Sequence, residues 1–143
     1  MKLLVLNGPN LNMLGRRDPE QYGSETLEDI EQLLVDTFPR YEISFFQSNL
    51  EGELVEEIQS LTDSNRDGVI VNFGGYSHTS VAIRDALELV ELPIVEVHLS
   101  NIHAREEFRE QTLTGAVADG IITGFGNQSY VLGVHALEKL VEK

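Results

Sequence analysis

The sequence predicts a single α/β domain built on a parallel β-sheet. Five short apolar runs are separated by segments whose apolar residues recur at helical spacing. Strict alternation of strands and helices implies parallel strands joined by right-handed crossovers, with helices on both faces of an open sheet. A length of 143 residues suits one domain with a sizeable core. We therefore expect one domain over residues 1–143, without repeats or linkers.

The five apolar runs are each short enough to be a single strand. They cover residues 2–6, 42–46, 68–71, 93–99 and 120–123. Five parallel strands connected by helices favour the order 2-1-3-4-5, which is the flavodoxin-like three-layer sandwich.

Five helices are expected between and after these strands. The first begins at residue 24 or 26 and ends before Pro39, since proline does not continue a helix. The others are expected at about 51–64, from 79 or 80 to 90, at 104–112 and at 127–141. The short helix at 104–112 would place Arg105 and Arg109 one turn apart.

The composition excludes several classes of function. A formal net charge of -14 would repel nucleic acid phosphates over most of the surface. The absence of cysteine removes disulfides, thiol nucleophiles and cysteine-ligated zinc. No apolar run approaches the roughly 20 residues of a membrane span, and the first run is too short for a signal sequence. We expect a cytoplasmic protein that binds neither nucleic acid nor a membrane.

Polar clusters follow three of the expected strands. They read Asn-Gly-Pro-Asn at 7–10, Asn-Phe-Gly-Gly-Tyr-Ser-His at 72–78 and His-Leu-Ser-Asn at 98–101. Open α/β sheets bind ligands outside the carboxyl ends of their strands, where the strand order reverses. About sixteen residues, from Gly8 to Gly23, connect the first strand to its helix, whereas most such loops have 2 to 6. We expect residues 11–23 to form a lid over a site at this edge.

The fourth expected strand carries a candidate general acid. In an extended chain the apolar residues at 95, 97 and 99 share one face, and Glu96, His98 and Ser100 share the other. A carboxylate beside an imidazole favours the protonated ring. We therefore interpret His98 as a general acid and Glu96 as its orienting partner.

Tyr22 of the expected lid is a candidate base. A guanidinium nearby favours a phenolate, and Arg17 precedes this tyrosine by five residues. The alternative is a ring that packs over the loop. The arginine pairs at 16–17 and at 105 and 109 could likewise either hold a small anion or form surface ion pairs.

Five motifs, spread from one end of the chain to the other, resemble type II 3-dehydroquinate dehydratase. They are Asn-Gly-Pro-Asn-Leu-Asn at 7–12, Leu-Gly-Arg-Arg with Pro and Tyr-Gly within 14–23, Gln-Ser-Asn with Glu-Gly-Glu-Leu within 47–54, His-Thr-Ser with Arg-Asp-Ala-Leu within 78–87, and Glu-Val-His-Leu-Ser-Asn-Ile-His-Ala-Arg-Glu-Glu-Phe-Arg at 96–109. Five long motifs in the same order are far more specific than any single pattern.

The resemblance implies a lyase of the shikimate pathway, which serves aromatic amino-acid and chorismate biosynthesis. Such enzymes eliminate water in the anti sense from 3-dehydroquinate, giving 3-dehydroshikimate through an enolate, without metal or Schiff base. The residue matching Tyr22 is the base, assisted by the one matching Arg17. The residue matching Asn10 holds a water that stabilises the enolate. The one matching His98, supported by Glu96, protonates the leaving hydroxyl.

The same resemblance implies a set of residues that bind the substrate. The carboxylate and hydroxyls of the substrate would be held by the residues matching Asn72, His78, Leu99, Ser100 and Arg109, with backbone amides from Leu99 and Ser100.

Two further positions carry implied roles at the margins of the site. Arg105 matches a lid contact, and Asp85 matches a residue through which a neighbouring subunit completes the pocket. The family pattern implies trimers assembled into a dodecamer, and no cofactor.

The chain departs from the family pattern in three places. Phe73 replaces a proline after Asn72, with Gly75 nearby; Leu50 stands where a histidine is common; and Gln-Thr-Leu at 111–113 stands where His-Ser-Tyr is usual. The lost proline frees the backbone around Asn72. We expect these changes to affect subunit packing and affinity more than the type of reaction.

The sequence is compatible with one alternative function and disfavours another. A non-catalytic flavodoxin-like module that binds a small cyclic carboxylate is the main alternative to an enzyme. A metal site formed by His78, His98 and His103 is disfavoured, since no pair has the i, i+4 spacing of a hydrolytic zinc site and no cysteine is present.

Overall fold

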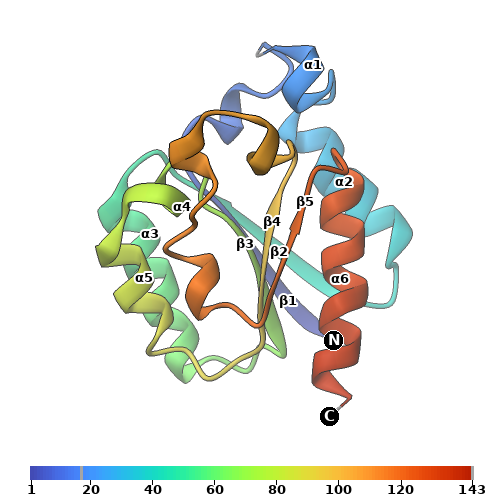
Figure 1. The fold of residues 1–143 in the computed structure, drawn as a ribbon. Coiled ribbons are helices and arrows are strands. Elements are labelled where there is room, and N and C mark those ends of the chain that lie inside the picture. The colour runs from blue at the N-terminus through green and yellow to red at the C-terminus, as the bar shows by residue number, and fades with distance from the viewer. Residues whose placement is uncertain (17, 143) are drawn as a thin grey trace.

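The computed structural model, which describes residues 1–16 and 18–142, has a parallel five-stranded sheet at its centre (Figure 1). The strands are β1 (Lys2–Asn7), β2 (Glu42–Gln47), β3 (Gly68–Asn72), β4 (Ile94–His98) and β5 (Gly120–Thr123). Their order is β2-β1-β3-β4-β5, with every neighbouring pair parallel. The flavodoxin-like order expected from the sequence is confirmed, and each strand end lies within one residue of its expected position.

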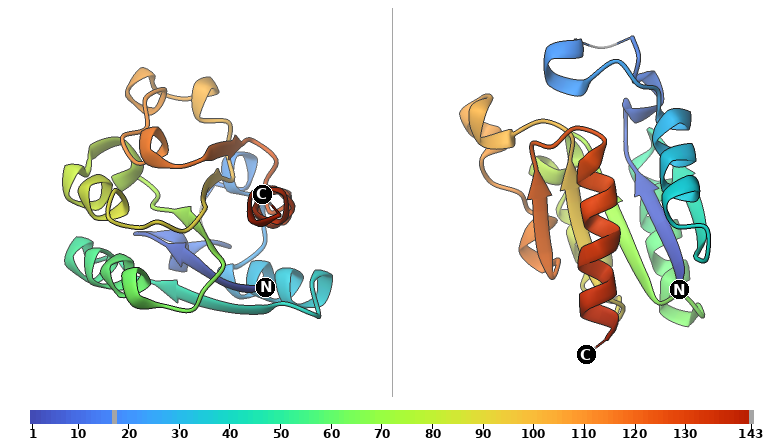
Figure 2. Two further views of the ribbon diagram at one scale, coloured as in Figure 1. Left: turned by 90° about the horizontal axis from the view of Figure 1, so that it is seen from below. Right: turned by 90° about the vertical axis from the view of Figure 1, so that its right-hand side faces the viewer.

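Helices cover both faces of the sheet and produce two separate cores. Helices α2 (Leu27–Thr37) and α6 (Gln128–Val141) lie on one face, and α3 (Glu51–Ser60) and α5 (Val81–Leu87) lie on the other (Figures 1 and 2). Alternate residues of β1 serve the two sides, since Leu3 and Val5 belong to the α2/α6 core and Leu4 and Leu6 to the α3/α5 core. Strands β1, β3 and β4 are buried on both faces and read as continuous apolar runs, whereas the edge strands β2 and β5 are only partly buried.

Local capping sets the helix starts. The Thr26 hydroxyl accepts a hydrogen bond from the Asp29 amide at 3.1 Å, and the Asp29 carboxylate accepts one from the Thr26 amide at 3.0 Å. This capping box selects residue 26 over residue 24 as the start of α2. Ser80 caps α5 in the same manner through the Ile83 amide at 3.0 Å. Helix α3 ends in a short 3₁₀ turn, Leu61–Asp63, so that the expected range 51–64 is helical over most of its length.

The prediction of a helix at 104–112 is wrong. The segment forms two 3₁₀ turns, Ile102–Ala104 and Glu107–Arg109, separated by extended backbone at Arg105 and Glu106. No residue from 103 to 112 is buried. A short helix gains its stability mainly by burying an apolar face, and this charged segment has none to bury.

The expected lid contains two short helical segments that were not anticipated. A 3₁₀ turn, Leu11–Met13, is anchored by the buried Leu11, and α1 (Pro19–Tyr22) follows it. A further short helix, α4 (Tyr76–Thr79), precedes α5. The lid stands at the carboxyl edge of the sheet, at the top of Figure 1. None of the helices over residues 1–16 and 18–142 has the length and apolarity needed to cross a membrane.

Candidate active site

A cavity of about 120 Å³ opens at the carboxyl edge of the sheet. Its walls come from the ends of β1, β3 and β4, from the lid, and from the loop that follows β4. Nine of the predicted site residues line it: Asn10, Tyr22, Asn72, His78, His98, Leu99, Ser100, Arg105 and Arg109. The topology therefore brings together residues that lie far apart in the sequence, as expected for an open α/β sheet.

Two predicted residues are placed elsewhere, and one is outside the described part of the chain. Glu96 lies directly behind His98 and does not line the cavity. Asp85 is exposed on α5 and is absent from the lining within a single chain. Arg17 lies outside the described residues.

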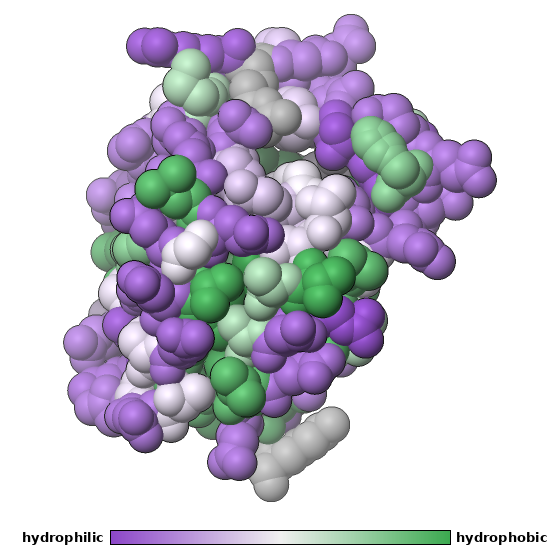
Figure 3. Space-filling view, turned by 90° about the vertical axis from the view of Figure 1, so that its left-hand side faces the viewer, coloured by the Kyte–Doolittle hydropathy of each residue, from purple (hydrophilic) through white to green (hydrophobic). Residues whose placement is uncertain are grey.

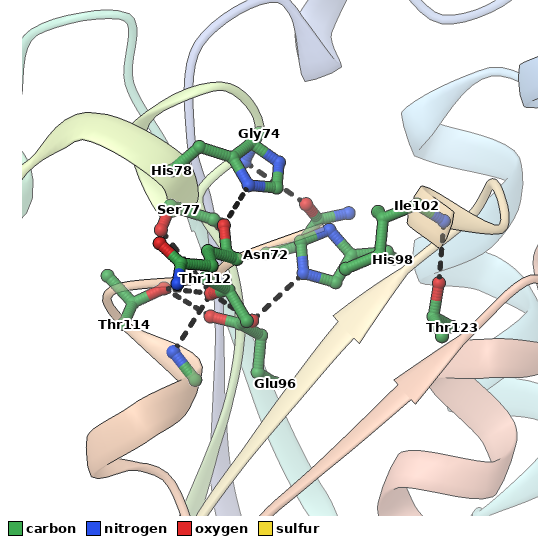
Figure 4. A network of polar contacts seen from close by, with 12 residues as sticks. Asn72, Gly74, Ser77, His78, Glu96, His98, Ile102, Thr112, Thr114 and Thr123 are labelled. Atoms are coloured by element: carbon green, nitrogen blue, oxygen red, sulfur yellow. Dashed lines mark hydrogen bonds and ion pairs between the residues drawn. The ribbon is translucent and has the colours of Figure 1, made fainter. Parts of the chain in front are cut away.

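Glu96 occupies a position on β4 that the neighbouring strands fill with apolar side chains. Glu96 is in register with Val71 of β3 and Ile121 of β5. Its carboxylate is fully buried and accepts a hydrogen bond from His98 Nε2 at 2.9 Å (Figure 4). Because Nε2 faces Glu96, the other ring nitrogen, Nδ1, is left to act on a molecule in the cavity.

His78 faces His98 across the site. The two rings are stacked with centroids 5.9 Å apart, and His78 Nδ1 lies 2.8 Å from the Gln111 carbonyl oxygen. A carbonyl only accepts, so Nδ1 carries the proton and Nε2 of the neutral ring is an acceptor. Burial lowers the pKa of His78, and the nearby His98 and Arg109 act in the same direction. His78 is thus suited to receive a hydrogen bond from a hydroxyl.

The floor of the cavity is a chain of buried hydrogen bonds between β1, β3 and α6. The Tyr130 phenol donates to Asn7 Oδ1 at 2.6 Å, and Asn72 Nδ2 donates to the Tyr130 oxygen at 2.9 Å. Burial raises the pKa of Tyr130, which keeps the phenol protonated and able to donate. The Gly74 amide donates to Asn72 Oδ1 at 3.2 Å. Both ends of the Asn72 amide are therefore held in place.

These contacts also bear on the missing proline after Asn72. Phe73 is fully buried in the α3/α5 core, and an added Cβ on Gly8 would lie 2.5 Å from the Phe73 carbonyl oxygen. The close approach of the two backbones and the buried ring restrain the segment that the proline would otherwise stiffen. The effect of this departure on substrate affinity stays a prediction.

The lid brings Tyr22 to the opposite wall. Tyr22 ends α1, and its ring lies under the guanidinium of Arg105, with Cζ 5.1 Å from the ring centroid. Arg105 also lies 3.4 Å from the Ser100 hydroxyl through Nη1. Arg105 therefore contacts the lid directly, which is the placement that the resemblance implies for it.

The start of the lid is fixed from β2. Asn10 has a left-handed backbone with φ of 70°, and its amide donates to Asn49 Oδ1 at 3.0 Å. Gln47 Nε2 donates to the Gly8 carbonyl at 3.1 Å and to Asn49 Oδ1 at 3.2 Å. The motif residues Gln47 and Asn49 thus hold Asn10 at the rim of the cavity.

Sequence reasoning missed three residues that hold the site together. Thr112 and Thr114 hydrogen-bond to Glu96, and Tyr130 orients Asn72. For Thr112 the sequence predicts only an effect on subunit packing and affinity. A threonine in a loop and a tyrosine on an apolar helix carry no local signal of such contacts, so nothing in the pattern could have singled them out.

The described residues contain no cluster of three or more histidine and acidic side chains arranged to hold a metal ion. The charged side chains of the cavity are instead cationic: Arg105 and Arg109 both line it. Arg109 is also ion-paired to Glu106 at 3.2 Å. The arrangement suits a small anionic molecule held between a histidine with a buried carboxylate and a tyrosine.

Fold and site together define a flavodoxin-like α/β protein with a polar pocket at the carboxyl ends of its strands. Residues 1–138 match the family model described as dehydroquinase class II. The chain belongs to the class II dehydroquinase family.

Several named proteins are similar to this chain over nearly its whole length. A 3-dehydroquinate dehydratase of Pelodictyon phaeoclathratiforme is 50% identical over 138 residues, covering 96% of this chain and 91% of that protein. One from Helicobacter pylori is 47% identical over 146 residues, covering 99% and 87%. The crystal structure of type II dehydroquinase from Butyrivibrio crossotus matches with a TM-score of 0.94 at 40% identity, covering 96% of this chain and 97% of that one. The one from Propionibacterium acnes gives 0.90 at 38%, covering 99% and 97%.

Proposed function

We propose that this protein is a 3-dehydroquinate dehydratase that eliminates water in the anti sense, with Tyr22 as base and His98 as acid. Relatives that match nearly all of the chain carry this name. The observation that carries the proposal is the shared cavity, which Tyr22 lines from the lid and His98, backed by the buried Glu96, lines from β4. A base and an acid on separate walls are what an anti elimination needs.

In the first step the Tyr22 phenolate removes a proton from the carbon next to the ketone. The electrons of that C–H bond form the carbon–carbon double bond of an enolate, and the negative charge moves to oxygen. The guanidinium of Arg105 lies over the Tyr22 ring, and by resemblance Arg17 assists this base. A water held by Asn10 stabilises the enolate oxygen.

In the second step the enolate collapses and re-forms the ketone. The C1–O bond breaks with its electron pair going to oxygen, and His98 Nδ1 gives a proton to the departing hydroxyl, which leaves as water. Glu96 holds Nε2 and stabilises the imidazolium before the transfer. Tyr22 then returns its proton to solvent.

The substrate is held by polar groups around the rest of the cavity. Asn72 and the neutral His78 bind hydroxyls, and the latter accepts through Nε2. The substrate carboxylate binds the Ser100 hydroxyl and the backbone amides of Leu99 and Ser100. Arg109 supplies a charge at the rim. All of these residues line the cavity.

The proposed reaction uses neither an imine nor a metal ion. No lysine is among the described residues that line the cavity. Treatment with borohydride in the presence of substrate should leave activity intact, and so should dialysis against a chelator. Inactivation by either treatment would contradict this part of the proposal.

We propose that Asp85 completes the pocket of a neighbouring copy of the chain. It is exposed on α5, one turn from the exposed Val81. The face that carries α3 and α5 shows apolar side chains among hydrophilic ones (Figure 3). Leu50, directly before α3, and Leu89, two residues after α5, are both exposed. A trimer-based dodecamer and a cytoplasmic location stay predictions, which gel filtration and cell fractionation would test.

The activity is tested by following the conjugated enone of 3-dehydroshikimate by ultraviolet absorbance after addition of 3-dehydroquinate. Turnover is the expected result. Folded protein that binds 3-dehydroquinate without turning it over would favour the non-catalytic binding module instead.

A further inference from the structure

The loop at 111–115 closes over the back of the acid pair, on the side away from the cavity. Leu113 N donates to the Ser77 carbonyl at 2.7 Å, which ties the loop to α4 beside His78. An added Cβ on Gly115 would lie 2.8 Å from Glu96 Oε2 and 2.5 Å from Ile121. The loop backbone is therefore packed directly against the buried carboxylate (Figure 4).

Three hydrogen-bond donors converge on Glu96. Oε2 accepts from His98 Nε2 at 2.9 Å and from the Thr112 hydroxyl at 2.7 Å, and Oε1 accepts from the Thr114 hydroxyl. The Gly115 amide donates to the Thr112 oxygen at 3.0 Å, so that the Thr112 proton is directed to the carboxylate. Each hydroxyl has a single proton. The Thr112 oxygen also lies 3.3 Å from the Ser77 carbonyl oxygen, and its shorter contact of 2.7 Å assigns the proton to Glu96.

This arrangement gives both oxygens of the buried carboxylate a hydrogen-bond donor. A buried charge without partners is costly, and an anion that accepts bonds at both oxygens is stabilised where it lies. Thr112 and His98 share one carboxylate oxygen, so the Thr112 bond also determines where that oxygen stands relative to the imidazole. Thr114 holds the second oxygen and prevents the group from turning.

We propose that Thr112 and Thr114 are positioning residues that keep the Glu96 carboxylate aimed at His98, so that the imidazole presents its other nitrogen to the substrate. The inference rests on the proposed function only for its effect on rate. The arrangement itself exists in the protein without substrate and can be measured there.

Removal of the Thr112 hydroxyl with little change of volume is the first test. Thr112→Val should lower kcat about 10-fold, with KM changed less than 3-fold, because a hydrogen bond to a charged group is lost away from the substrate. Thr112→Ser keeps the hydroxyl and should restore most of the rate. Thr62→Val, at an exposed threonine outside the cavity, is the control for the substitution itself.

Coupling to Glu96 separates a positioning role from a general structural one. In a Glu96→Gln background, which should itself reduce kcat more than it raises KM, the further change Thr112→Val should cost less than 2-fold. Thr114→Val should behave in the same way. Equal losses in both backgrounds would overturn the proposal, as would a loss that appears in KM alone.

Nuclear magnetic resonance of the ¹⁵N-labelled histidines tests the arrangement without any turnover. The resonance assigned to His98, identified by its absence in His98→Ala, should show a hydrogen-bonded Nε2–H in the parent and in Thr112→Ser, and a displaced signal in Thr112→Val. An unchanged His98 signal in Thr112→Val refutes the inference even if the parent is an active dehydratase. If the signal is displaced in Thr112→Val but the parent does not turn over 3-dehydroquinate, the inference is supported and the proposed function is contradicted.

Discussion

The two walls of the cavity are built in opposite ways. On the acid side, Glu96 and His98 are buried on a central strand, and Glu96 accepts hydrogen bonds from His98, Thr112 and Thr114. On the base side, Tyr22 is half-buried at the end of α1, a four-residue helix with no buried residue. Its ring packs against Arg105 and against the edge of the α2/α6 core.

The difference teaches which part of the site is fixed by folding and which part is held by fewer buried contacts. A side chain held by buried hydrogen bonds is positioned before any substrate arrives, at the cost of tying catalysis to stability. A side chain on a segment without a core of its own can be displaced at small cost, which suits a lid that admits substrate and excludes water. Substitutions on the two walls should therefore differ in what they change.

The largest effect is expected from His98→Ala. Loss of the general acid should reduce kcat about 1000-fold, within the range usual for such groups. Because Glu96 then loses one of its donors inside the protein, the free energy of unfolding should also fall by about 1–3 kcal/mol. His103→Ala, at an exposed histidine, should alter neither steady-state kinetics nor the denaturation midpoint. An unchanged free energy of unfolding in His98→Ala would contradict the proposal that the same buried contacts serve both catalysis and stability.

Tyr22→Phe should reduce kcat about 100-fold or more, since the phenyl ring keeps the contact with Arg105 but cannot take a proton. In contrast to His98→Ala, the thermal midpoint should stay within experimental error. The control is Tyr41→Phe, at a tyrosine that stacks on Phe38 beside the amino end of β2. A variant with near-parent turnover would show that Tyr22 is not the base.

A smaller effect is expected where the lid rejoins the fold. Gly23 has φ of 75° and ψ of -177°, a conformation that residues with a Cβ rarely adopt. Gly23→Ala should shift the position of α1 and lower kcat/KM about 3- to 10-fold, with little change in stability because no residue of α1 is fully buried.

The matched control is Gly52→Ala. Gly52 lies in α3, where an added Cβ meets no atom within 4 Å. This change should raise stability by about 0.5–1 kcal/mol and leave kinetics untouched. If Gly23→Ala destabilised the protein as a whole, the lid would be part of the folding unit.

The smallest effect concerns pH. Burial lowers the pKa of His78 in the folded protein, whereas the unfolded chain takes up this proton near about pH 6.5. As pH falls through that value the unfolded state binds more protons, so stability decreases. His78→Gln should therefore show a shallower fall in thermal midpoint between pH 7.5 and 5.5 than the parent, with His103→Gln as the control for loss of a histidine. An identical slope in His78→Gln would indicate that the ring is well solvated.

The five strands and the cluster of site residues at one edge could be read from the sequence for identifiable reasons. Strands buried on both faces are continuous apolar runs, and polar residues directly after such runs must meet at the carboxyl edge. The helix expected at 104–112 failed because helical spacing of two arginines says nothing about whether the segment has a face to bury. Both arginines reach the cavity all the same, from turns.

The sequence by itself determined the order of the strands, the place of the site and the pairing of Glu96 with His98, because alternation along one strand is a local property. Tertiary structure alone decided what surrounds them. Thr112 and Thr114 reach Glu96 across 16 and 18 residues, and Tyr130 reaches Asn72 across 58 and Asn7 across 123. Such contacts depend on which loop and which helix pack against the sheet, and no periodicity in the chain encodes them.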